Sequence, residues 1–388
     1  MRLSLHTFPL RSPKWKSPSL PSWRKPQMPY YRIRLKRPFS EWLLRAAFIV
    51  YIVVCVTAYF QYEVPWIKGQ SSVRIGPDSD SYWAAVTAAR DGTGESLVSL
   101  AQNLLGPVLL GLILRNGFAV MCFNIGLFVL AMKIAGSITG VNKTIFGSLI
   151  LLNAVLLPAL VTLNKEILAL FAAVLTAKYV LSSRRPTLLF AATLIVSFLT
   201  RWEQTAIFIL YLLIEHSPLR FRPKLALGLL VGGLSIGYPL MFSILQIDPH
   251  MFDWILHDAN TILRLNSIQD AGGFFIVVVP KIFMAIAGRL ATPWVYWSGD
   301  FLKDEFQDPQ QDIFQPLGCL AFLLVIAYAL LKRRLQLKNP LPMLIILTLV
   351  IAAVTPFIQP RYTYPAYVLL CLEIARSKNR SCPPPESA

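Results

Sequence analysis

Long apolar runs alternate with short polar linkers along most of the chain. A bilayer core of about 30 Å needs about 20 apolar residues per crossing helix, so the runs predict about ten membrane-spanning helices. They cover residues 45–62, 118–135, 144–163, 167–181, 187–199, 205–214, 225–245, 316–331, 341–358 and 363–374. Two more apolar runs, 97–114 and 274–290, are ambiguous because each contains proline and polar side chains.

The composition agrees with an all-α polytopic membrane protein. Of the 388 residues, 55% are hydrophobic and only 15% are charged, whereas soluble domains carry about 25% charged residues. The formal net charge is +17. Lys and Arg gather near the N-terminus and in short linkers, which is typical of loops retained in the cytoplasm. We therefore expect the lipid bilayer as a partner, and no nucleic acid.

The chain divides into three predicted regions. Residues 1–40 are rich in Pro, Lys and Arg with almost no acid, which predicts a disordered cytoplasmic arm on anionic lipid head groups. Residues 41–376 form the transmembrane domain, and residues 377–388 form a cytoplasmic tail. The five cysteines have no CxxC spacing, so we expect neither a disulfide framework nor a cysteine metal site.

Basic residues set the expected orientation, because cytoplasmic loops carry an excess of Lys and Arg. The strongest markers after the N-terminal arm lie at 184–185, 220–224, 332–338 and 376–380. All of them are cytoplasmic only if neither 97–114 nor 274–290 completes a crossing. We therefore expect both runs to be interfacial or re-entrant helices on the outer side. Both termini are then cytoplasmic, and large outer loops cover 63–117 and 246–315.

The first outer loop carries two carboxylates, Asp78 and Asp80, directly after Gly76-Pro77. Such a pair can orient a sugar, act as a general base, or hold a hard divalent cation such as Mg²⁺ or Mn²⁺ through oxygen ligands. The structural alternative is a helix N-cap at Asp80, which would satisfy backbone N–H groups of a helix that begins near Ser81.

Three further polar turns lie at the outer ends of predicted spans. They contain Lys165 with Glu166, Arg201 with Glu203, and Arg361 with Tyr362. Ionisable groups at membrane depth are costly and usually functional. Arginine can hold a phosphate bidentately and lysine can neutralise a phosphate oxygen, so these six residues are candidates for substrate binding. The ordinary alternative is a set of interfacial side chains that snorkel toward water.

No Walker A, GxSxG, HExxH or GxGxxG pattern occurs. ATP-driven pumping, serine hydrolysis, zinc-site proteolysis and dinucleotide chemistry therefore have no support. The late outer loop, 246–315, combines acids with aromatic residues. That composition is typical both of sugar binding and of an interfacial lid.

The order of these features resembles the multi-pass C-type (GT-C) glycosyltransferases that use polyprenyl-phosphate-linked sugars. The resemblance spans residues 40–375 and rests on short motifs: Asp78-Ser-Asp80-Ser-Tyr82-Trp83, Asn103-Leu-Leu-Gly-Pro107, Asn164-Lys165-Glu166 and Arg361-Tyr362-Thr-Tyr364-Pro365. It implies a GT-C-like, inverting transferase that moves a sugar from a polyprenyl-phosphate donor to a glycan or lipid acceptor. It further implies that the transfer takes place on the periplasmic face of a bacterial inner membrane.

The resemblance also implies roles for the candidate residues. Asp78 or Asp80 would take the acceptor proton, while Arg361, helped by Lys165 and Arg201, would hold the donor phosphate. We expect two departures from this family, a shorter chain and no C-terminal soluble domain, and they leave the acceptor class and any metal requirement open.

Two other functions compete with sugar transfer. An envelope-polysaccharide polymerase also works on the outer face and should depend mainly on outer arginines. A lipid or solute transporter is the non-enzymatic alternative. Transporters favour inverted repeats with broken spans at the midplane, and the sequence contains no convincing internal repeat.

Overall fold

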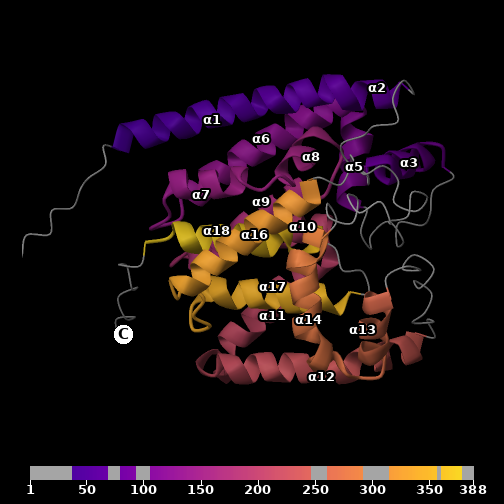
Figure 1. Ribbon diagram of the computed structural model, residues 1–388, viewed down its shortest axis with the longest axis vertical. Coiled ribbons are helices and arrows are strands. Elements are labelled where there is room, and N and C mark those ends of the chain that lie inside the picture. Colours follow the sequence, from indigo (N-terminus) through magenta and orange to yellow (C-terminus); the bar gives the residue numbers. More distant parts are fainter. Residues whose placement is uncertain are drawn as a thin grey trace, which may run out of the picture.

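The computed structural model describes residues 37–68, 79–92, 105–245, 260–291, 314–355 and 360–377. Within these ranges the chain is helical and contains no β-strand. Asp78, most of the predicted arm and tail, and parts of both predicted outer loops lie outside the described residues. Most of the main helices lie side by side in one bundle (Figure 1): α1 (Arg37–Ala58), α6 (Gly117–Gly136), α9 (Glu166–Leu181), α10 (Thr187–Thr200), α11 (Trp202–His216), α12 (Pro223–Leu245), α16 (Phe314–Leu331), α17 (Pro340–Val354) and α18 (Tyr364–Ala375).

Four helical segments are long and apolar enough to cross a membrane: Glu41–Glu63, Gly117–Gly136, Pro223–Leu240 and Phe314–Leu331. The first joins α1 to the π-helix Tyr59–Glu63. In the segments of α1 and α12, only 17% of the apolar window is buried inside the protein. Large apolar surfaces of this kind mark contact with lipid. The protein is therefore a helical membrane protein with its outer helices against the bilayer.

The remaining predicted crossings correspond to shorter helices. The helices α9, α10, α11, α17 and α18 have 16, 14, 15, 15 and 12 residues. Each is shorter than the roughly 20 residues that usually cross a bilayer. The count of about ten crossings thus stays a prediction.

The centre of the bundle is built from α9 and α18. Every residue of α18 from Tyr364 to Ala375 is buried, as are most residues of α9. These helices are apolar all round, which is the pattern expected of a helix enclosed by other helices. They pack against each other and against α6, α10 and α17, so the positions of their first residues are fixed by the whole bundle.

One predicted span is broken in the structure. The run 144–163 forms α7 (Lys143–Leu151) and α8 (Leu156–Val161), separated at Asn153. The Asn153 side chain accepts a hydrogen bond from the backbone N–H of Val155 at 3.0 Å, a local bond that competes with continued helix. The prediction of a continuous helix here was wrong, because apolar composition alone does not reveal such a turn.

The two ambiguous runs form short helices. The first gives α5 (Leu105–Leu114), which packs on α3 (Ser79–Arg90). The second gives α14 (Phe274–Ala287), which follows α13 (Asn260–Asp270) and runs across the direction of α12 and α17 in Figure 1. The expectation that neither run completes a crossing stays a prediction.

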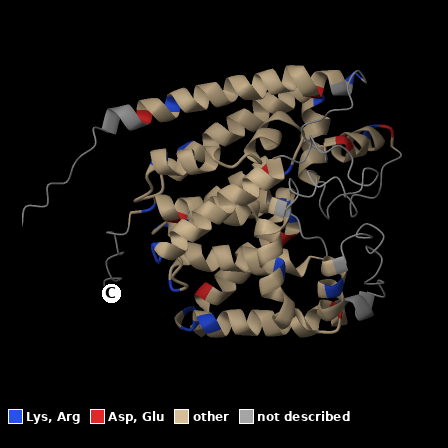
Figure 2. Cartoon of the chain, viewed as in Figure 1, with Lys and Arg blue, Asp and Glu red and all other residues tan. Residues whose placement is uncertain are grey.

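The basic segments meet at one end of the bundle, which we name the basic end. Lys178 donates to the carbonyl of Ser137 at 2.9 Å, and Arg334 donates to the carbonyl of Arg376 at 2.8 Å. Arg185 forms an ion pair with Glu215. Figure 2 shows that charged residues are few along the helices and gather near their ends. The opposite end, where α9, α11 and α18 begin, is named the site end.

Candidate functional site

The turn between α8 and α9 places a lysine and a glutamate inside the protein at the site end. The Asn164 side chain accepts a hydrogen bond from the Lys165 N–H at 2.7 Å, which shapes the turn. Lys165 is the N-cap of α9 and Glu166 its first residue, where the helix dipole favours a negative charge. Lys165 is 6% exposed and Glu166 only 2%. Both charged side chains of this turn are therefore buried inside the protein, and they do not extend toward water as snorkelling side chains would.

Arg201 sits between α10 and α11, where its extended backbone (φ −162°, ψ 134°) separates the two helices. It is 8% exposed. Its Nη2 lies 3.7 Å from Oε1 of Glu166, and its Cζ lies 4.2 Å from the ring centroid of Tyr362. One arginine thus links the beginning of α9 to the 3₁₀ turn Pro360–Thr363 before α18.

That 3₁₀ turn supplies a second arginine. The Cζ of Arg361 lies 5.7 Å from the ring centroid of Tyr362, so the same aromatic ring has two guanidinium groups beside it. Burial lowers the pKa of Arg361 from its ordinary value. Two guanidinium groups beside one ring can bind an anion together, although Glu166 already offsets part of the charge of Arg201.

Lys165 belongs to the same cluster. Its pKa falls from 10.5 to about 7, first because of burial and then because of the nearby charge of Arg201. The carboxylates of Glu166 and Glu203 act in the opposite direction and raise it in part. Lys165 therefore interacts electrostatically with three side chains of the site: Arg201, Glu166 and Glu203.

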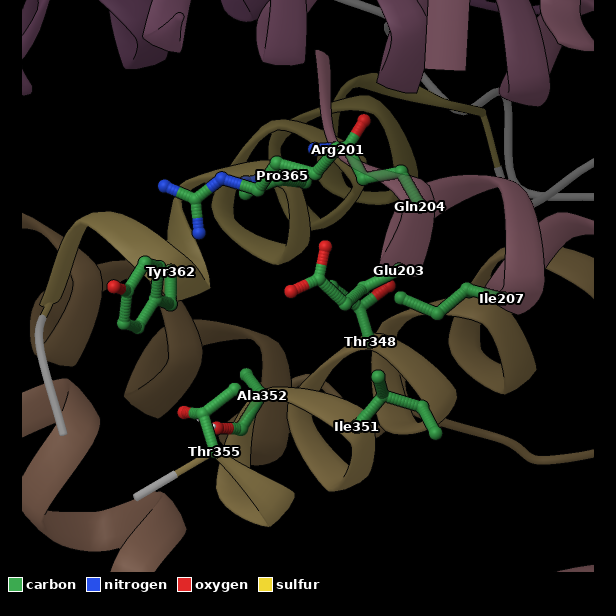
Figure 3. A pocket seen from close by; sticks show the side chains of 10 residues that line it. All are labelled: Arg201, Glu203, Gln204, Ile207, Thr348, Ile351, Ala352, Thr355, Tyr362 and Pro365. Carbon is green, nitrogen blue, oxygen red and sulfur yellow. Dashed lines mark hydrogen bonds between the residues drawn. The ribbon is translucent and has the colours of Figure 1, made fainter. Parts of the chain in front are cut away.

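A pocket opens beside this cluster (Figure 3). Its cavity volume is about 30 Å³. Arg201, Glu203 and Tyr362 supply its charged and aromatic side, and α17 supplies a side of small hydroxyl and apolar residues. The full lining consists of Arg201, Glu203, Gln204, Ile207, Thr348, Ile351, Ala352, Thr355, Tyr362 and Pro365.

The first predicted outer loop reaches the cluster through α3. Tyr82 is 2% exposed, and its pKa is raised by burial and then by the charge of Glu166. Asp80 lies in the first turn of α3 and is partly buried. Because α3 already begins at Ser79, the alternative of Asp80 as the N-cap is wrong. Asp78 is outside the described residues.

Sequence reasoning missed several residues around the site. Glu63 is 2% exposed and accepts a hydrogen bond from Ser79 at 3.5 Å. Lys281 is completely buried and donates to Gln269, whose amide donates to the carbonyl of Val354 at 2.7 Å. This network holds the last residue of α17 beside the pocket. The sequence signal for this network was Lys281 within an apolar run.

Metal binding gains no support from the described part of the chain, where no group of three His, Cys, Asp or Glu side chains could hold an ion. The four cysteines within the described ranges are free. No protein family, curated protein or solved structure matches this chain. The site must therefore be interpreted from its own geometry.

Proposed function

We propose that this protein is a membrane-embedded glycosyltransferase. It moves a sugar from a polyprenyl-phosphate donor to a glycan or lipid acceptor at the outer face of a bacterial inner membrane. In this topology about ten helices cross the bilayer. The basic end and both termini face the cytoplasm, as the positive-inside rule requires.

One observation supports the proposal above the others. Arg201, Glu166 and Tyr362 come from separate parts of the chain and meet at the end of the bundle opposite the basic end. Positive charge on an outer face is not explained by cytoplasmic retention. Buried cations beside a pocket, in a protein surrounded by lipid, suit an anionic head group attached to a lipid tail.

The chemistry of the reaction fits these groups. A departing polyprenyl phosphate carries negative charge, and preorganised cations stabilise such charge strongly in a site with little water. Arg361, Arg201 and Lys165 supply this stabilisation. Asp78 and Asp80 remain the carboxylates that the resemblance assigns to proton transfer.

A polysaccharide polymerase is the second candidate. The observation in its favour is the pair Arg201 and Arg361 beside one tyrosine, since a lipid diphosphate needs two cationic contacts. The donor separates the two enzymes: a polymerase uses a diphosphate-linked repeat unit, and a transferase uses a monophosphate-linked sugar.

The test uses the purified full chain in proteoliposomes with a panel of labelled donors of both kinds. Arg361→Lys keeps the charge but loses the bidentate fork, so we expect donor use to fall at least about tenfold, and Arg361→Ala to lose it further. Arg220→Ala, an exposed arginine at the basic end, is the matched control and should behave like wild type. Normal turnover by correctly inserted Arg361→Ala would refute the phosphate assignment, and use of diphosphate donors alone would favour the polymerase.

A further inference from the structure

The two carboxylates of the cluster are placed differently. Glu166 lies 3.7 Å from Arg201 with a side chain that is 3% exposed, and it does not line the pocket. It is therefore a charge partner that keeps the arginine compatible with burial. Breaking such a pair leaves an uncompensated buried charge, which is strongly destabilising.

Glu203 is the second carboxylate of the cluster, and it lies at the pocket. It lies in the first turn of α11 and lines the pocket. Its Oε2 is buried and has no hydrogen-bond partner among the described residues. The same holds for both carboxylate oxygens of Glu166, so the feature that distinguishes Glu203 is its place in the pocket lining. Figure 3 shows its carboxylate turned toward the middle of the pocket, between Arg201 and the residues of α17. A buried carboxylate oxygen without a donor is costly, which calls for a functional explanation.

We propose that Glu203 is the general base that activates the acceptor hydroxyl. This assignment rests on the proposed sugar transfer and moves the base from the first outer loop to α11. The acceptor oxygen forms the new bond to the anomeric carbon as its proton passes to the Glu203 carboxylate. The bond between the anomeric carbon and the phosphate oxygen breaks, and its electron pair leaves with the polyprenyl phosphate.

The surroundings of Glu203 suit this role. Because Glu166 is the carboxylate beside Arg201, the Glu203 carboxylate is left to accept a proton from a substrate. Gln204 lines the same pocket, and its amide nitrogen, which is buried without a partner among the described residues, can donate to a sugar hydroxyl. The hydroxyls of Thr348 and Thr355 donate to the carbonyls of Leu344 and Ala352, so they can act only as acceptors. Tyr362 supplies an aromatic side, over which Arg201 lies. Asp80 does not line this pocket, and neither do Arg361 and Lys165.

The experiment uses the full chain in proteoliposomes with the labelled polyprenyl-phosphate sugar that the wild type turns over best. Glu203→Gln keeps size and loses basicity, so turnover should fall about 10²–10⁴-fold while equilibrium binding of the donor stays within about threefold. Glu203→Asp, which retracts the carboxylate, should keep part of the turnover. Glu215→Gln, on the same helix at the basic end, is the matched control and should keep wild-type turnover.

The outcomes separate the two proposals. If the wild type transfers no sugar from any monophosphate donor, the proposed function fails and Glu203 loses its assignment with it. If the wild type is active and Glu203→Gln keeps its turnover while Asp78→Asn or Asp80→Asn loses it, the base lies in the first outer loop and the inference alone is overturned. Loss of donor binding by well-folded Glu203→Gln and Glu203→Asp would make Glu203 a binding residue and would also overturn it.

Discussion

At the scale of single residues, the charge of Lys165 changes near neutral pH. Its pKa of about 7 means that it is protonated below that pH and neutral above it. If its charge holds the donor phosphate, donor affinity should decrease as the pH rises through 7, and the loss should level off above the pKa of the donor complex. Lys165→Arg should give a flat profile from pH 6 to 9, because arginine stays charged.

The measurement is the dissociation constant of a labelled donor across this pH range, for wild type and variant in the same liposomes. A flat wild-type profile would show that the Lys165 charge contributes nothing to donor binding. Lys165→Met, uncharged at every pH, should match the weak affinity of the wild type at high pH.

The sequence singled out several residues that lie close together in the structure, but it did not predict how they pair. Five of these residues stood out because they lie in the polar turns between apolar runs: Lys165, Glu166, Arg201, Glu203 and Tyr362. Their closeness in the sequence suggested that Arg201 pairs with Glu203. In the structure, Arg201 lies beside Glu166 instead. That pairing depends on where the ends of α9 and α10 meet in space, which no local pattern encodes.

At the scale of helices, Asn124 in α6 holds the end of α8. Its amide nitrogen donates to the carbonyls of Ala159, Leu160 and Thr162 at 3.2, 3.3 and 2.9 Å. Asn124 is fully buried. The carbonyls at a helix C-terminus have no partner within the helix, so this side chain replaces the missing donors. It thereby fixes the turn that carries Lys165.

Asn124→Leu should therefore cost about 1–3 kcal/mol of stability through unpaired carbonyls, and it should also lower turnover by displacing Lys165. The matched control is Asn142→Leu, which removes the exposed N-cap of α7 at the basic end. That control should lose about 0.5–2 kcal/mol yet keep its turnover. Thermal unfolding in detergent and the proteoliposome assay measure the two effects. Full turnover by Asn124→Leu would remove it from the positioning of the site.

Helix boundaries were predicted well where a polar turn follows an apolar run. The run 187–199 became Thr187–Thr200, and 167–181 became Glu166–Leu181. The break at Asn153 was missed because one asparagine in an apolar run is compatible with a continuous helix. The partner that supports the break, Asn124, lies on another helix.

At the scale of the whole molecule, the basic end and the site end lie at opposite ends of the bundle. The proposed topology therefore predicts which loops are accessible from each side of the membrane. In a cysteine-free background, Asp91→Cys after α3 should react with an impermeant thiol reagent in intact cells. Thr139→Cys and Ser183→Cys at the basic end should react only after permeabilisation. All three positions are exposed. Reaction of the Ser183 position in intact cells would reverse the proposed orientation.

The helices around the pocket are short, and in the proposed topology this affects the lipid around them. The helix α10 exposes Leu188, Ile195 and Phe198 to the surroundings, and with 14 residues it spans only about 21 Å. The surrounding hydrocarbon is about 30 Å thick, so annular lipids must compress near the pocket or water must enter it from the periplasm. A donor phosphate there could meet a water-soluble acceptor below the general level of the head groups. Turnover should then fall in liposomes of longer-chain lipids, where this hydrophobic mismatch is greater, and rates independent of acyl-chain length would argue against local thinning.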